Sequence, residues 1–188
     1  MPEVPAQSRS DRLLPWLGLA AAAAMLFAHL DAGSLLGSDD AIYAAVARDA
    51  LRTGAWWDFS WHGRPWFEKG PLLTWLLMAS QALLGDSEAA LRLPGVLFGL
   101  GLVAGCYRLA RRLGIGVRPS LAAAGLALAS NVLYFNARRP MTDVPGASLA
   151  LAGFVLVAFG DGRARPLIGG ACLGLASLAK VVSPVPFV

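Results

Sequence analysis

The sequence predicts an all-α integral membrane protein: a multi-span helical bundle with an external loop that carries amphipathic helices next to the membrane. Hydrophobic residues make up 56% of the 188 residues and charged residues only 15%, whereas soluble domains carry about 25% charged residues. Long apolar runs alternate with short polar segments, and basic residues cluster at the ends of the runs, as in membrane proteins. The net charge of +4 does not indicate nucleic-acid binding, because no basic face with interleaved aromatic residues accompanies it.

The first element is an apolar run at residues 13–30, which we expect to cross the membrane. Residues 1–12 precede it as a short polar tail with Arg9 and Arg12, which the positive-inside rule places in the cytoplasm. A cleavable signal peptide is the alternative. No small-x-small cleavage pattern precedes the next acidic residues and further apolar runs follow, so a retained span is the preferred interpretation.

Residues 31–92 form the predicted external loop, with surface helices at 41–53 and 71–84. The first helix places apolar residues at helical spacing and meets a stop signal at Gly54. Tryptophans follow it closely, as expected for the headgroup layer: Trp56, Trp57, Trp61 and Trp66.

The run at 71–84 is too short for a full crossing. Its 14 residues cover about 21 Å as a helix, against a hydrocarbon core of about 30 Å. If it did cross, the arginine-rich segment at 108–118 would lie outside, against the positive-inside rule. We therefore expect 71–84 to remain on the outer surface.

The remaining apolar runs complete five predicted spans: 13–30, 93–110, 119–135, 144–160 and 166–186. This topology gives a multi-pass protein of the plasma (inner) membrane with a cytoplasmic N-terminus. It places residues 138–143 on the external face. The last run reaches the end of the sequence without a polar tail, so we expect the chain to be the N-terminal part of a longer protein.

Three aspartates are candidates for catalysis. Asp39 and Asp40 begin the first surface helix, where carboxylates also compensate a helix dipole. Asp143 precedes a predicted span and is placed to cap it, with Pro145 just inside the helix. On the predicted topology all three lie on one membrane face, as a divalent-cation site requires. Asp40 and Asp143 are therefore candidate ligands for a divalent cation such as Mg²⁺, Mn²⁺ or Zn²⁺.

Four further residues are candidates for binding. Glu68 and Lys69 form either a solvated ion pair or, through the lysine, a point charge for a lipid phosphate. Arg92 reads most simply as a charge that reaches the membrane surface from a helix end. Lys180 lies about 21 Å along the last run, in the outer part of the membrane, where a charge indicates a pathway or binding role unless it snorkels.

Taken in order, these residues resemble the GT-C membrane glycosyltransferases, in the branch of protein O-mannosyltransferases and the lipid A aminoarabinose transferase. The resemblance covers nearly all of the chain from about residue 38. It rests on an ordered set of elements: Asp39-Asp40 with Tyr43, Thr53-Gly54, Gly63 to Leu72, Arg92-Leu93-Pro94, Asp143, and Gly174 to Lys180. Two positions depart from the pattern. Asp40 stands where the branch has glutamate, and Gly70 replaces the first proline after Lys69, which loosens the turn there.

The resemblance implies a GT-C-type bundle of about seven spans, of which this chain holds a part. It also implies an inverting enzyme that transfers a sugar from a polyprenyl-phosphate donor to a lipid or protein acceptor on the extracytoplasmic face. Asp39 would act as the base or orient the acceptor, with Asp40 and Asp143 in support or on a cation. Lys69, Arg138 and Lys180 would stabilise the leaving phosphate, and Glu68 and Arg92 complete the implied substrate-binding set.

Two other function classes remain open at this point. A transporter or channel subunit would use Lys180 and Asp143 as an intramembrane relay and predicts an inverted repeat, which these residues do not contain. A non-catalytic assembly protein of the cell envelope with the same fold would leave Asp39 dispensable.

Overall fold

The computed structural model describes residues 9–35, 37–66, 68–160, 162 and 164–180. Helices dominate the described part of the chain. In sequence order they are α1 (Arg9–Phe27), α2 (Ser38–Thr53), α3 (Pro71–Leu84), α4 (Glu88–Arg112), α5 (Val117–Ala129), α6 (Asn131–Ala137), α7 (Asp143–Phe159) and α8 (Ala164–Ala179). A short antiparallel hairpin, β1 (Ser60–Trp61) and β2 (Arg64–Pro65), lies between α2 and α3.

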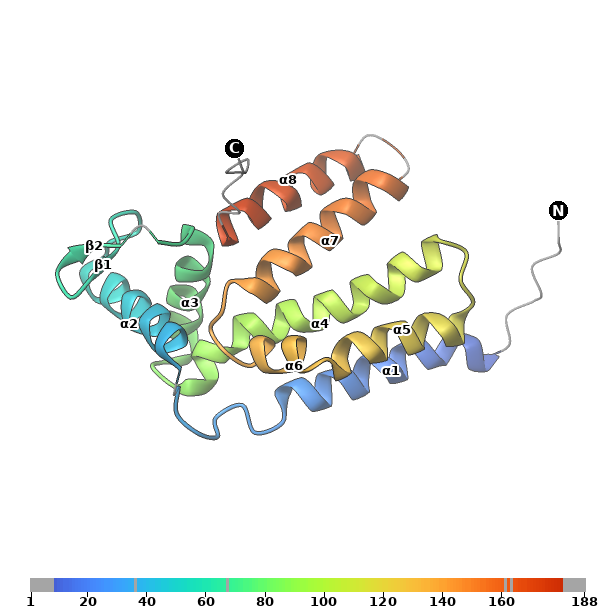
Figure 1. Cartoon of the computed structure of the whole chain (residues 1–188), viewed down its shortest axis with the longest axis horizontal. Helices are drawn as coiled ribbons and strands as arrows, with labels where there is room; N and C mark the ends of the chain where they lie inside the picture. Colours follow the sequence, from blue (N-terminus) through green and yellow to red (C-terminus); the bar gives the residue numbers. More distant parts are fainter. Residues whose placement is uncertain (1–8, 36, 67, 161, 163, 181–188) are drawn as a thin grey trace, which may run out of the picture.

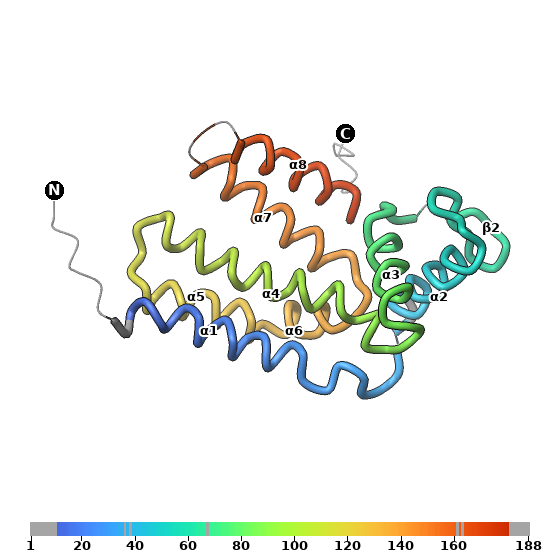
Figure 2. The backbone as a smooth tube through the Cα atoms, turned by 180° about the vertical axis from the view of Figure 1, so that it is seen from behind, coloured from blue at the N-terminus to red at the C-terminus, as the bar shows by residue number. Residues whose placement is uncertain are grey.

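The molecule consists of an elongated helical bundle with a smaller lobe at one end (Figures 1 and 2). In the bundle, α4 lies at the centre and contacts α1, α5 and α7, while α8 packs along the outer side of α7. The lobe contains α2, the hairpin and α3. It joins the bundle where α3 packs against α4 and the end of α8.

Each part of the molecule has its own apolar core. The lobe buries side chains of α2 and α3 together with Phe59, Trp66 and Leu91. The bundle core is formed by α1, α4, α5, α6 and α7 around Leu26 and Val96. Small residues allow close helix contact, as in other membrane proteins: a Cβ on Gly153 of α7 would lie 2.8 Å from the carbonyl of Gly169 in α8.

The central helix α4 has clear signals at both ends. The Ser87 hydroxyl accepts a hydrogen bond of 3.2 Å from the backbone N–H of Ala90, and Glu88 lies in the first turn. Arg111 and Arg112 lie in the last turn, where the helix dipole favours positive charge. These signals explain why α4 starts before the predicted span at residue 93.

Helices form at both places where surface helices were predicted, and their position at the membrane surface stays a prediction. Helix α3 has the predicted bounds, with Pro71 in its first turn and Gly85 at its end. Helix α2 ends at Gly54, which adopts a left-handed φ of 71°, and begins three residues earlier than predicted. The hairpin between them was not predicted, because strands of two residues leave no periodic pattern.

The helices that occupy the predicted spans differ in length. Among the described residues, only α4 is by itself long and apolar enough to cross a membrane. The predicted helix at 119–135 is divided into α5 and α6, bent by 64°, and the pair gives a second candidate if it counts as one span. Helices α7 and α8 are apolar but shorter, with 17 and 16 residues. Parts of the predicted tail (1–8) and last span (181–186) lie outside the described residues, and the number of crossings stays a prediction.

Candidate active site

Most of the candidate residues lie where the lobe meets the bundle. Four chain segments converge there: the start of α2, residues 68–70 before α3, the start of α7, and the residue that follows α8. The first two belong to the lobe and the last two to the bundle (Figure 1). The site is therefore built across the junction, and its geometry depends on how the two parts are held together.

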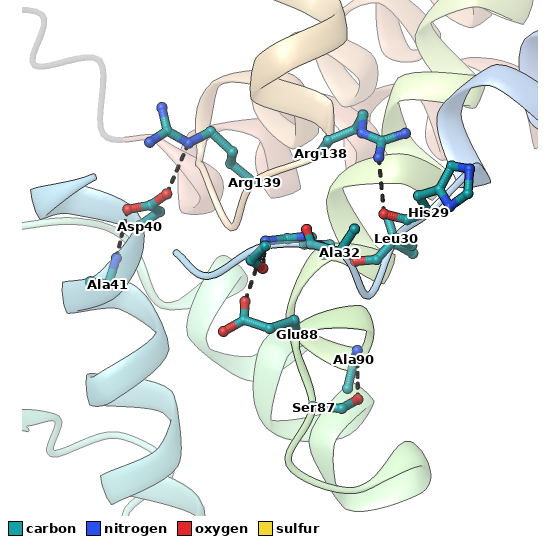
Figure 3. A network of polar contacts seen from close by, with 12 residues as sticks. His29, Leu30, Ala32, Asp40, Ala41, Ser87, Glu88, Ala90, Arg138 and Arg139 are labelled. Atoms are coloured by element: carbon teal, nitrogen blue, oxygen red, sulfur yellow. Dashed lines mark hydrogen bonds and ion pairs between the residues drawn. The ribbon is translucent and has the colours of Figure 1, made fainter. Parts of the chain in front are cut away.

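The first turn of α2 separates the two adjacent aspartates. Asp39 is exposed, and no described side chain forms a hydrogen bond or ion pair with it. Asp40 is only 2% exposed. One of its carboxylate oxygens accepts a 2.8 Å hydrogen bond from Arg139 Nε and the other a 2.9 Å bond from the N–H of Ala41 (Figure 3). Asp40 thus anchors the lobe to the bundle, and Asp39 is left available to a substrate.

An ion pair joins the start of α7 to the end of α8. Lys180 Nζ donates a 2.5 Å hydrogen bond to Asp143 Oδ1. Both side chains remain accessible, at 47% and 40% exposure. Asp143 does not act as the predicted helix cap: it is the first residue of α7, and Thr142 precedes it as a cap without a side-chain hydrogen bond. The pair holds an ammonium group at the junction.

Tyr43 is a buried phenol on which the negative charges of three chain segments act. Its side chain is buried in the lobe core, one helical turn after Asp39. Burial first, and then the negative charges of Asp39, Asp143 and Glu68, raise the pKa of Tyr43 to about 12. Asp39, Glu68 and Asp143 come from α2, the segment before α3 and α7, so the structure brings these predicted site residues together.

The segment at 68–70 is fixed by a contact with α8. Gly70 is buried, and a Cβ at this position would overlap the backbone carbonyl of Leu178. Its φ of −66° is accessible to any residue, so glycine is needed here for space rather than for conformation. Half-buried Lys69 directly precedes Gly70, and Lys180 lies two residues after Leu178. The two lysines therefore flank the same contact between the lobe and α8. Gly70 therefore does not simply loosen the turn, because it permits close approach of the lobe to α8.

Two other candidate arginines, Arg92 in α4 and Arg138 after α6, contact the end of α1 and the residues that follow it. Arg92, 7% exposed, donates hydrogen bonds of 2.6 to 2.9 Å to the carbonyls of Leu30, Ala32 and Gly33. Arg138 donates to three carbonyls at the C-terminal end of α1, those of Met25, Leu26 and His29. Figure 3 shows Arg138 and Arg139 pointing in opposite directions. Both Arg92 and Arg138 satisfy backbone acceptors here, and phosphate binding by them stays a prediction.

The predicted metal ligands are each paired with a cation. Asp40 contacts Arg139 and Asp143 contacts Lys180. Within the part of the chain that the structure describes, no group of three or more His, Cys, Asp or Glu side chains is arranged to hold a metal ion. These pairs do not form a ready ligand set for a divalent cation, and a metal site at Asp40 and Asp143 stays a prediction.

Sequence reasoning did not identify Arg139 as part of the site. Its signal was an exception: two arginines on a predicted external turn, against the positive-inside rule. The structure explains the exception, since each arginine is used locally, Arg139 by Asp40 and Arg138 by the end of α1. Tyr43 was recognised only as part of the resemblance.

Comparisons with known proteins point to one family. The sequence pattern of the dolichyl-phosphate-mannose-protein mannosyltransferase family matches residues 68–185. An undecaprenyl phosphate-alpha-4-amino-4-deoxy-L-arabinose arabinosyl transferase from Pseudomonas fluorescens is 36% identical over 100 residues, which is 53% of this chain and 18% of the relative.

Solved structures show the same fold. ArnT from Cupriavidus metallidurans in the apo state matches with a TM-score of 0.75 and 25% identity over 91% of this chain. The same protein bound to undecaprenyl phosphate matches with a TM-score of 0.75 and 27% identity over 92% of this chain. The likeness confirms the predicted all-α membrane fold. This chain spans 33% of the length of those structures.

Proposed function

This chain belongs to the dolichyl-phosphate-mannose-protein mannosyltransferase family, and from this premise we propose that it carries active-site residues of a polyprenyl-phosphate-dependent glycosyltransferase. The enzyme would transfer a sugar to a lipid or protein acceptor on the extracytoplasmic face. The resemblance seen in the sequence is thereby confirmed at the level of the family. The observation that supports the reaction is that an exposed carboxylate, Asp39, and an accessible ammonium, held by the Lys180–Asp143 pair, both belong to segments at the junction of lobe and bundle.

Asp39 is the proposed general base. Its carboxylate is exposed at the junction, so it can accept the proton of an acceptor hydroxyl as that oxygen attacks the anomeric carbon of the donor sugar. The bond from this carbon to the phosphate oxygen breaks in the same step, and the polyprenyl phosphate leaves with the electron pair. Attack opposite the leaving group inverts the anomeric centre.

Lys69 and Lys180 are the proposed charges for the leaving phosphate. An ammonium placed where negative charge develops stabilises the transition state more than the ground state. Asp143 keeps Lys180 at the junction by a 2.5 Å contact and is the positioning residue of this pair. Because both side chains are about half exposed, the pair can open and let Lys180 turn to a phosphate.

Asp40 and Arg139 act on the site indirectly. Their contact fixes the first turn of α2 against the loop between α6 and α7 and so sets the direction of Asp39. No step of the proposed reaction passes through a metal ion, although Asp40 and Asp143 remain the predicted ligands.

The proposed topology places the reaction on the outer face of the plasma membrane. The arginines at the end of α4 and the start of α5 would lie in the cytoplasm, together with the N-terminus. The junction lies at the opposite end of α4 (Figure 2). A multi-pass arrangement with this orientation puts Asp39, Lys69 and Lys180 within reach of a donor held in the outer leaflet.

A transfer assay tests the proposal. Membranes that contain the full-length gene product would be incubated with radiolabelled polyprenyl-phosphate sugars, and label on an acceptor would be measured. Asp39→Asn should lower transfer by at least about 100-fold, the lower range for loss of a general base. Asp58→Asn, which changes an exposed carboxylate of the lobe outside the junction, is the matched control and should be neutral. Equal transfer in both variants would show that Asp39 is not the base and that the site is misplaced. A folded wild type without transfer from any donor would favour the transporter or the non-catalytic assembly protein.

A further inference from the structure

The end of the bundle opposite the lobe contains a pocket lined by arginines. It has a volume of about 360 Å³ and lies between the C-terminal end of α4, the end of α7 and the start of α8. Its charged lining residues are Arg108, Arg111, Arg112 and Arg165, and Phe159 contributes an apolar wall. No carboxylate is found among the described residues that line it.

A second, apolar cavity adjoins this pocket. It has a volume of about 680 Å³ and is lined by α1, α4, α5 and α7, mostly by leucine, alanine and glycine. Arg108, Val155 and Leu156 line both spaces. The two spaces therefore adjoin at these residues, with positive charge at the bundle end and an apolar part beside it.

The guanidinium groups of Arg108, Arg111 and Arg112 retain hydrogen-bonding capacity. Arg111 donates from Nη1 to the carbonyl of Ile115, and Arg112 donates from Nη1 to the carbonyl of Phe159. A guanidinium has five N–H donors, so each keeps donors for a ligand. Arg108 is exposed, and no described residue forms a hydrogen bond or ion pair with it. Several like charges around one concavity favour an anion.

Membrane topology alone does not require this arrangement. The positive-inside rule accounts for arginines near a cytoplasmic loop, and exposed Arg118, at 79% side-chain exposure, fulfils it without lining the pocket. The rule gives no reason for arginines from α4 and α8 to line one hollow that adjoins an apolar cavity.

We propose that this site binds an anionic phospholipid, with its phosphate among the arginines and an acyl chain in the adjoining apolar cavity. Charge complementarity selects an anion, and the adjoining apolar volume selects a lipid over a soluble anion. Basic pockets between helices at the cytoplasmic side bind such headgroups. The lipid would fasten α4, α7 and α8 together at this end. The proposal is independent of the sugar-transfer reaction.

Lipid binding to the purified full-length protein tests the proposal. Native mass spectrometry from nanodiscs would compare retention of phosphatidylglycerol with that of phosphatidylcholine. We expect preferential retention of phosphatidylglycerol, and an affinity at least about tenfold lower in the double variant Arg108→Gln/Arg111→Gln. Arg118→Gln removes a charge near the same end without touching the pocket and should bind as the wild type does. Equal losses of phosphatidylglycerol affinity in the double variant and in Arg118→Gln would show that the general positive charge of this end, and not the pocket, attracts the lipid. That result would overturn the proposal.

A second variant tests the apolar half separately from charge. Gly125 lines the apolar cavity, and a Cβ there meets open space. Gly125→Leu should therefore fold and also weaken phosphatidylglycerol retention. Unchanged phosphatidylglycerol retention in Gly125→Leu would contradict an acyl chain in the cavity. This is the result expected if another protein segment fills the cavity instead. Competition by inorganic phosphate at millimolar concentration as strong as that by the lipid would also overturn the proposal, because it would indicate a soluble-anion site.

Discussion

Removal of the Asp40–Arg139 contact should destabilise the junction. Arg139→Gln takes away the partner of a carboxylate that is 2% exposed, and the 2.8 Å hydrogen bond with it. Breaking a fully buried pair costs about 3–5 kcal/mol. Arg139 itself is 38% exposed, so water screens the pair, and we expect a coupling of about 1–3 kcal/mol.

A double-mutant cycle measures this coupling. Unfolding of the purified protein in detergent would be followed for Asp40→Asn, Arg139→Gln and the double variant. The Asp11–Arg118 pair is the control, with a separation of 4.0 Å and Arg118 exposed at 79%; it should couple by less than about 1 kcal/mol. If the two changes at Asp40 and Arg139 add within about 0.5 kcal/mol, the contact does not anchor the lobe and the reasoning fails.

Three further changes probe the same junction. Gly70→Ala should lower both the melting temperature and the transfer rate, because its Cβ would overlap a carbonyl of α8. Gly174→Ala, with open space around the glycine, should be neutral. Equal melting temperatures of the two variants would contradict the close approach of the lobe to α8. Tyr43 should titrate near pH 12 in the absorbance difference between wild type and Tyr43→Phe, and Asp39→Asn should lower that midpoint. Since the pKa of Tyr43 in the folded protein lies above the ordinary value of 10.0, the neutral phenol should contribute its full stability below pH 10. This contribution should be lost as the pH rises to 12. A titration midpoint of Tyr43 at pH 10 would exclude its burial near carboxylates. Asp143→Asn should change the free energy of unfolding by less than about 1 kcal/mol, since the Asp143–Lys180 pair is about half exposed. It should nevertheless raise the KM for the donor, because Asp143 positions Lys180. An unchanged KM would contradict this positioning role.

The sequence predicted the local features of the fold better than the breaks within apolar runs. Helix α3 has clear end signals in Pro71 and Gly85, and its bounds were predicted correctly. The run at 119–135 reads as one continuous apolar stretch, yet the chain turns at Ser130, whose hydroxyl accepts a hydrogen bond from the N–H of Leu133 and starts a new helix. Apolar composition alone carries no information about such a bend.

The candidate site was predictable where residue type alone suggested chemistry. Asp39, Asp143 and Lys180 were singled out because charges are rare beside apolar runs, and the structure brings Asp143 and Lys180 into contact. Arg139 was missed because its partner Asp40 lies 99 residues away in sequence. The resemblance implied that Arg138 binds the phosphate, and this stays a prediction. Its contacts with backbone carbonyls at the end of α1 could not be predicted, because their location depends on the tertiary fold.

The most direct test of the proposed site separates its two kinds of charge. Single-turnover transfer and the affinity for polyprenyl phosphate would be measured side by side for Asp39→Asn and Lys180→Met in the full-length protein. If Asp39 is the base and Lys180 binds the phosphate, Asp39→Asn should lower the transfer rate by at least about 100-fold with unchanged affinity, and Lys180→Met should weaken the affinity by at least about tenfold. Loss of affinity in Asp39→Asn, or unchanged affinity in Lys180→Met, would contradict this division of roles at the junction.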